Sequence, residues 1–195
     1  MATEMIDRVN RQSERLGDPC YVPSDVAIAK HVFGANCGPV SAAAALGEDV
    51  CDVMRWFPHF MNPERRFTNL TTMRNMFTSK GIRHRVLRKQ FPSHGVALIQ
   101  WLGPWTSRDF FSRWSLRHSH WVAVSGNFVF DYLDETWRTL ADWERQLVPW
   151  YLEQMPQAAG WDIKFGVEIE KSNSPWQASF FSELFTTLDV RISSI

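Results

Sequence analysis

Two hydrophobic patterns follow one another along this chain. The first consists of stretches rich in small and apolar residues, and the second consists of short apolar runs that are separated by turn residues. The first pattern predicts helices at residues 38–46, 48–57 and 69–80, with Gly81 ending the last of them. The second pattern predicts strands at residues 82–87, 96–102, 121–125, 128–133, 162–170 and 186–192. Helices followed by strands indicate an α+β fold with a helical part and a sheet part.

The segments between and beyond these elements predict further features. Residues 1–18 have the composition of a polar helix, and residues 19–25 predict an extended connector. Thr139 is placed to cap a helix through Trp143 and Leu147. Loops are predicted at residues 58–66 and 171–176.

No internal repeat, low-complexity tract or long linker divides the 195 residues. We therefore expect a single domain over residues 1–195. It would comprise an N-terminal extension at 1–25, a core at 31–150 and C-terminal strands at 151–195 that complete the sheet.

Cys37 stands at the mouth of one predicted helix, in the segment Asn-Cys-Gly-Pro-Val-Ser-Ala-Ala-Ala-Ala-Leu. Proline is favoured at the first helical position, so Pro39 places the helix start within two residues of the thiol. The positive pole of a helix and its unpaired N–H groups favour the thiolate, and the same N–H groups can receive an oxyanion. Cys37 is therefore the best candidate for a catalytic nucleophile.

A candidate base lies in the segment Ser-His-Trp-Val-Ala-Val-Ser-Gly-Asn-Phe-Val-Phe-Asp, which spans residues 119–131. Two apolar runs flank Ser-Gly-Asn, and this pattern predicts a β-hairpin. His120 begins one strand and Asp131 ends its partner, so both lie at the same end of the hairpin and the carboxylate can orient the imidazole. Asp134 follows three residues later, but we prefer Asp131 because it falls at the predicted strand end.

This order of Cys37, His120 and Asp131 resembles the papain-like cysteine peptidases. Asn-Cys-Gly-Pro opens a small-residue helix, and His-Trp-Val-Ala-Val opens a strand that turns back to an Asp. The chain most resembles the C39-like branch, which includes the double-glycine peptidases, over about residues 31–147. The resemblance implies a helical lobe packed against an antiparallel sheet lobe. It also implies a nucleophilic Cys37, His120 as general base and acid, and Asp131 as the orienting group.

Two further sets of residues are candidates for contact with the substrate. Papain-like enzymes usually carry a Gln six residues before the Cys, but here that position is His31. The His31 imidazole and the Asn36 amide can each donate a hydrogen bond, so both are candidate oxyanion donors. Trp105 and Trp121, two of the chain's ten tryptophans, are candidates for lining a substrate groove, and residues 103–107 predict a cleft-edge loop.

The charge balance gives no reason to expect nucleic acid or an anionic membrane as a partner, because 21 basic residues match 21 acidic ones. Arg83, Arg85, Arg88 and Lys89 form a local basic stretch that is typical of the solvated face of a strand. The expected partner is a protein or peptide substrate, and the sequence does not predict an oligomeric state.

Three cysteines cannot all pair within one chain, and their spacing matches no zinc pattern, so we expect free thiols in a reducing compartment. The first fifteen residues lack the apolar core of a secretory signal, and no run is long enough to cross a bilayer. We expect a cytoplasmic protein, or one delivered into a host cell without a Sec signal.

The sequence thus predicts a cysteine peptidase that hydrolyses a peptide or isopeptide bond through a thioester acyl-enzyme, with no metal or organic cofactor. The same thiol and imidazole would also serve a papain-like acyltransferase, a transglutaminase or a cell-wall amidase. His31 in place of Gln leaves open a further alternative, a catalytically inactive papain-like binding module.

Overall fold

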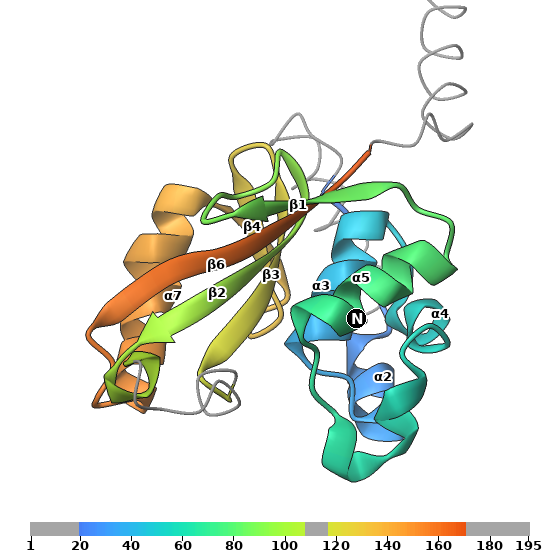
Figure 1. The fold of residues 1–195 in the computed structure, drawn as a ribbon, viewed down its shortest axis with the longest axis horizontal. Coiled ribbons are helices and arrows are strands. Elements are labelled where there is room, and N and C mark those ends of the chain that lie inside the picture. Colours follow the sequence, from blue (N-terminus) through green and yellow to red (C-terminus); the bar gives the residue numbers. More distant parts are fainter. Residues whose placement is uncertain (1–19, 108–116, 171–195) are drawn as a thin grey trace, which may run out of the picture.

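The computed structural model describes residues 20–107 and 117–170 and has N-terminal helices packed against a six-stranded antiparallel sheet (Figure 1). The expected α+β class is confirmed. The helices are α2 (Val26–Phe33), α3 (Cys37–Leu46), α4 (Val50–Met54), α5 (Leu70–Ser79) and α7 (Leu140–Gln154). The strands are β1 (His84–Arg88), β2 (His94–Leu102), β3 (Ser119–Ser125), β4 (Phe128–Asp131), β5 (Thr136–Thr139) and β6 (Gly160–Ile169). The helix predicted at 1–18, the strand at 186–192 and the loop at 171–176 lie outside the described residues.

The strand order in the sheet is β1-β6-β2-β3-β4-β5. The last described strand, β6, therefore lies between β1 and β2, which confirms a strand close to the predicted 162–170. β5 was not predicted, because it is only four residues long and its last residue, Thr139, is also the N-cap of α7. The strand predicted at 128–133 ends at Asp131, where the chain turns towards β5.

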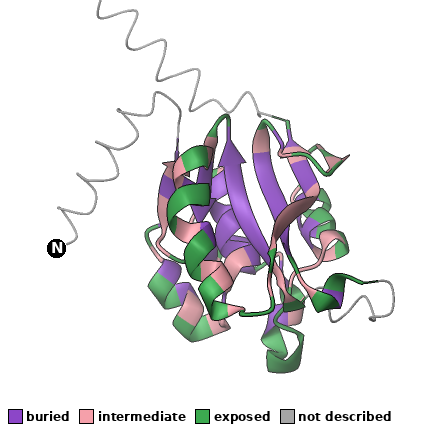
Figure 2. Ribbon diagram, turned by 90° about the vertical axis from the view of Figure 1, so that its left-hand side faces the viewer, coloured by how far each residue is buried: buried purple, intermediate pink, exposed green. Residues whose placement is uncertain are grey.

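Helices cover both faces of this sheet: α3 packs on one face, and α7 packs on the other (Figure 1). Strand β3 is buried along almost its whole length as a result. Figure 2 shows that the strands of the sheet are largely buried. The side chains of β3 alternate between two hydrophobic cores, Trp121 and Ala123 in the core shared with α3, Val122 and Val124 in the core shared with α7.

Helix α3 packs closely on the sheet because its residues are small. Its four consecutive alanines, residues 42–45, are all buried. The Ser41 hydroxyl donates a 2.9 Å hydrogen bond to the backbone carbonyl of Trp121 in β3. The Asn36 side chain caps the first turn by accepting from the Gly38 N–H. The cap and the docking to β3 together fix the position of Cys37 relative to the sheet.

The sequence pattern did not predict α2, and the side chain that precedes this helix takes part in a tertiary contact. Asp25, the residue before α2, makes no side-chain cap to its own helix. Its carboxylate instead accepts hydrogen bonds of 2.8 Å from the N–H groups of Val50 and Cys51, at the start of α4.

Among the described residues, no helix is long and apolar enough to cross a membrane.

Candidate active site

The structure brings the Cys37 thiol, the His120 imidazole and the Asp131 carboxylate into one cluster. His120 Nε2 lies 3.0 Å from Asp131 Oδ1 and 3.1 Å from Oδ2. The Cys37 side chain lies beside the His120 side chain, close enough to raise the pKa of the imidazole. Because Nε2 faces the carboxylate, Nδ1 is the ring nitrogen left for the sulfur. The three residues come from the start of α3, the start of β3 and the end of β4.

The hairpin register explains how Asp131 reaches His120. Ser125 pairs with Phe128 and Ala123 with Phe130, so the turn is at residues 126–127 as predicted. Continued by one residue, this register places Asp131 opposite Val122, on the same face as His120 and diagonal to it. Diagonal neighbours on one face of an antiparallel pair are still within reach of long side chains.

The imidazole and the carboxylate are both removed from solvent, with 6% of His120 and none of Asp131 exposed. Burial alone lowers the pKa of His120, but the negative charge of Asp131, its hydrogen bond and the contact with Cys37 outweigh burial and raise that pKa to about 10. Burial raises the pKa of Asp131, but the His120 charge and the hydrogen bonds to the carboxylate lower it to about 2. The His120–Asp131 pair is therefore ionised at neutral pH.

Two side chains of α7 complete the environment of the carboxylate, and the sequence analysis assigned neither of them to the site. Trp143 Nε1 donates to Asp131 Oδ2 at 2.8 Å. The Tyr151 hydroxyl donates to Asp131 Oδ1 at 2.9 Å and lies 3.0 Å from His120 Nε2. The Leu133 N–H donates to Oδ1 at 2.9 Å. Asp131 thus accepts from four donors, which holds a buried carboxylate in its charged form.

Replacing Tyr151 with Phe removes one donor from this carboxylate and is expected to lower the free energy of unfolding by about 1–2 kcal/mol. The Tyr132 hydroxyl makes no hydrogen bond to any described residue, so Tyr132→Phe is the matched control and is expected to stay within about 0.5 kcal/mol of the parent protein. Urea denaturation of the three proteins measures the difference. Equal stability of both variants would mean that the Tyr151 hydroxyl does not hold the carboxylate.

The alternative carboxylate and the alternative histidine lie elsewhere. Asp134 accepts a 2.8 Å hydrogen bond from Arg138 Nε, and Arg138 Nη2 also bonds to it. The His118 ring stacks on the Trp105 ring with 3.7 Å between the ring centroids. The structure thus places Asp131 and His120, rather than Asp134 and His118, beside Cys37.

The two candidate oxyanion donors have different surroundings. Asn36 is the N-cap of α3, and its Nδ2 donates to the Arg66 carbonyl at 2.8 Å. This capping role was not predicted, and it occupies the Gly38 N–H as well. His31 is exposed in the last turn of α2 and has no hydrogen bond to any described residue. The oxyanion roles of His31 and Asn36 stay predictions.

A third oxyanion donor is available from the backbone. The N–H of Cys37 is at the first position of α3, where helical N–H groups have no intrahelical partner. Within the described part of the chain it donates to no acceptor. An oxyanion formed beside the sulfur would lie close to this N–H.

The glycine after the cysteine has a packing role. A Cβ at Gly38 would lie 2.3 Å from the Thr68 hydroxyl oxygen, closer than real Cβ atoms approach. The segment before α5 therefore passes directly over the first turn of α3 and packs against it at Gly38. The backbone carbonyl of Thr68 also accepts a 2.7 Å hydrogen bond from Trp121 Nε1, which joins this segment to β3.

The two tryptophans predicted to line a substrate groove differ. Trp121 is only 2% exposed and packs in the core between α3 and the sheet, so its predicted contact with substrate is wrong. The physical reason is strand alternation, which directs its side chain away from the face that carries His120. Trp105 lines a hollow in the described surface, in the predicted loop 103–107, and its contact with a substrate stays a prediction.

All three cysteines are free thiols, but their surroundings differ. Cys20 is buried. Burial and the hydrogen bond to the Asp25 carboxylate raise the pKa of the Cys51 thiol to about 11, so at neutral pH Cys51 is almost entirely the unreactive thiol. Cys37 contacts the protonated imidazole instead.

The described residues contain no cluster of three or more His, Cys, Asp or Glu side chains that could hold a metal ion.

Comparisons of the chain with protein-family models, curated proteins and solved structures find no match.

Proposed function

We propose that this protein is a papain-like thiol hydrolase that cleaves a peptide or isopeptide bond through Cys37, His120 and Asp131. One observation carries the proposal: a thiol at a helix start contacts an imidazole that a buried carboxylate holds at 3.0 Å. A nucleophile, a base and an orienting group are the three components of acyl-transfer catalysis by this route. The α+β arrangement, with the nucleophile on a helix and the other two groups on adjacent strands, supports a papain-like fold.

The proposed reaction has two steps. The Cys37 sulfur attacks the carbonyl carbon of the scissile amide, a C–S bond forms, and the carbonyl electrons move to the oxygen beside the Cys37 N–H. His120 then gives its proton to the leaving nitrogen as the C–N bond breaks, which leaves a thioester. In the second step His120 takes a proton from water, the hydroxide attacks the thioester, and the C–S bond breaks to release the acid. Asp131 stabilises the imidazolium in both steps.

The hydrolase and the papain-like acyltransferase, transglutaminase and amidase alternatives all form the same thioester. They differ in the acyl acceptor, the molecule that takes the acyl group from the thioester.

The inactive binding module is a different proposal, and one observation favours it. The Asn36 amide donates to the Arg66 carbonyl and the Gly38 N–H donates to Asn36 Oδ1 in the cap of α3, so fewer donors remain for an oxyanion.

A burst assay with p-nitrophenyl acetate tests the proposal. We expect a rapid release of about one equivalent of nitrophenol, followed by slow turnover as water hydrolyses the acetyl thioester. Mass spectrometry should locate the acetyl group on Cys37. Cys37→Ala is expected to lose the burst, and Cys51→Ala is expected to keep it. If added glycinamide captures the acetyl group faster than water does, the acyltransferase alternative is favoured. No burst at all would support the binding module.

A further inference from the structure

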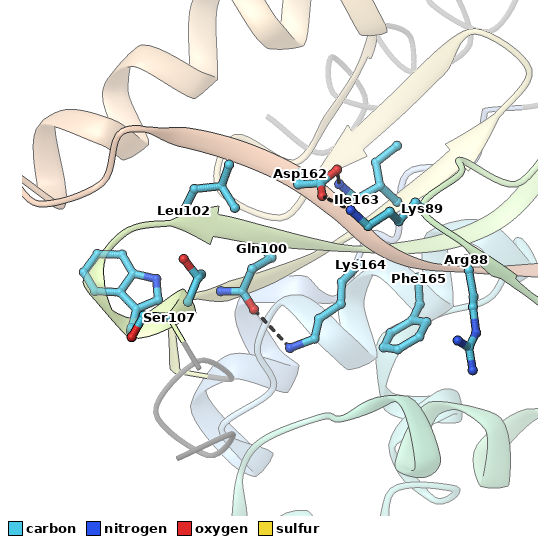
Figure 3. Close-up of a pocket in the computed structure, with 11 residues that line it drawn as sticks. Arg88, Lys89, Gln100, Leu102, Ser107, Asp162, Ile163, Lys164 and Phe165 are labelled. Carbon is cyan, nitrogen blue, oxygen red and sulfur yellow. Dashed lines mark hydrogen bonds and ion pairs between the residues drawn. The ribbon is translucent and has the colours of Figure 1, made fainter. Parts of the chain in front are cut away.

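A hollow of about 660 Å³ lies on the sheet, and its lining includes residues of β2, the strand that pairs with β3 (Figure 3). Its wall is formed by the ends of β1, β2 and β6 together with the short 3-10 turn Pro104–Thr106. The chemistry of the wall is mixed. Cationic side chains come from Arg88, Lys89 and Lys164, and apolar surface comes from Leu102, Trp105 and Phe165.

A β-bulge directs one of the cations into this hollow. Leu98 in β2 pairs with Phe165 in β6, but the next residue, Ile99, pairs with Ile163. Lys164 is the extra residue of the bulge, and such residues re-aim a side chain. Lys164 and Phe165 consequently project from the sheet on the same side (Figure 3). Lys164 Nζ donates to Gln100 Oε1 at 3.2 Å, and burial lowers the pKa of Lys164.

The described lining residues carry an excess of positive charge. They include three cations, Arg88, Lys89 and Lys164, and one carboxylate, Asp162. Lys89 already pairs with Asp162, with 3.2 Å between Nζ and Oδ2. Arg88 forms no ion pair with any described residue. A partly apolar wall strengthens the attraction of such a surface for a negative group compared with open water.

The hollow adjoins the strand that carries the catalytic imidazole. Gln100 pairs with Ser119, and Gln100 Nε2 donates to the His118 carbonyl at 2.9 Å. The Trp105 ring stacks on the His118 ring. Two lining residues thus contact the segment directly before His120, which connects the hollow to the strand that carries this imidazole.

We propose that this hollow is a substrate subsite that takes an acidic side chain of a peptide. Arg88 and Lys164 attract the carboxylate, and Phe165, Leu102 and Trp105 contact the apolar part of the side chain. As a role in catalysis the inference rests on the proposed function, but the preference for an acidic peptide is a binding property and can be measured without catalysis.

Binding of fluorescein-labelled hexaglutamate and hexaglutamine to the Cys37→Ala protein, measured by fluorescence anisotropy at low salt, tests the proposal. We expect hexaglutamate to bind at least about tenfold more tightly, the preference that one charge-assisted contact provides. Arg88→Glu and Lys164→Gln should each remove most of this preference. The matched control is Arg83→Glu, because Arg83 lies just before β1, is highly exposed and pairs with Glu170 away from the hollow. It should keep the preference.

Equal affinity of the two peptides would overturn the subsite, and so would an equal loss in Arg83→Glu and Arg88→Glu, which would indicate attraction by surface charge alone. Arg88 is exposed, so Arg88→Glu is expected to fold normally, and a thermal melt checks this. If the burst assay fails but hexaglutamate still binds more tightly, the proposed hydrolase activity is refuted and the acidic subsite is supported. If the burst occurs but the two peptides bind equally, the hydrolase activity is supported and the acidic subsite is refuted.

Discussion

Cys37→Ala is expected to lower the rate of acyl transfer by at least about 10³-fold and to leave the fold unchanged. The reaction requires the sulfur as its nucleophile, and no other cysteine can take its place. Cys20 is buried, and the pKa of Cys51 is raised to about 11. Alanine is a strong helix former, so at this partly exposed helix start the free energy of unfolding should change by less than about 1 kcal/mol.

The measurements for this variant are the rate of p-nitrophenyl acetate turnover and the urea midpoint. Cys51→Ala is the control, and we expect it to keep the parent rate. An unchanged turnover rate in Cys37→Ala would show that the nucleophile lies elsewhere.

Asp131→Asn is expected to have the largest combined effect, a rate loss of about 10⁴-fold together with a stability loss of about 3–5 kcal/mol. The rate falls because the imidazolium loses the charge that stabilises it. The stability falls because Asp131 is fully buried and accepts from four donors, some of which would face the amide NH₂ of an asparagine. Asp134→Asn is the matched control and should retain the parent rate, because Asp134 pairs with Arg138.

The same variant should weaken a specific pH dependence of stability. The pKa of His120 is raised from 6.5 to about 10, so its contribution is complete below pH 6.5 and is lost as the pH rises through 10. The pKa of Asp131 is lowered from 3.8 to about 2, so its contribution is complete above pH 3.8 and is lost as the pH falls through 2. Urea denaturation across this range should show a plateau between these limits in the parent protein.

In Asp131→Asn the acid loss should be absent and the alkaline loss much smaller, because Asp131 is the main group that raises the pKa of His120 and Cys37 contributes less. Asp134→Asn should retain both losses. An alkaline loss of parental size in Asp131→Asn would mean that Asp131 is not the main cause of the raised pKa of His120.

The sequence was sufficient to predict the three central residues because their placement depends on local rules. Pro39 and the alanines locate the start of α3, and the Gly-Asn turn with period-two alternation brings His120 and Asp131 to one end of a hairpin. These rules act within about a dozen residues, so they survive in the folded chain. They also explain why Asp131 rather than Asp134 lies beside the imidazole.

The features that the sequence analysis missed depend on packing between distant segments. Trp143 and Tyr151 reach Asp131 only because α7 lies on the far face of the sheet, and nothing near those residues encodes that placement. Trp121 was assigned to a groove because an alternating strand does not show that helices cover both of its faces. The bulge at Lys164 depends on pairing with β2, more than sixty residues earlier in the chain.

The most direct test of the central claim is the rate at which iodoacetamide alkylates each cysteine of the native protein at pH 7, with the sites quantified by mass spectrometry. We expect Cys37 to react at least about tenfold faster than Cys51, because the Cys37 side chain lies beside the charged His120 imidazole, whereas burial and Asp25 raise the pKa of the Cys51 thiol to about 11. His120→Asn should abolish that difference, and Asp134→Asn should preserve it. Labelling of Cys37 that is no faster than that of Cys51, or a Cys37 rate unchanged in His120→Asn, would contradict the account.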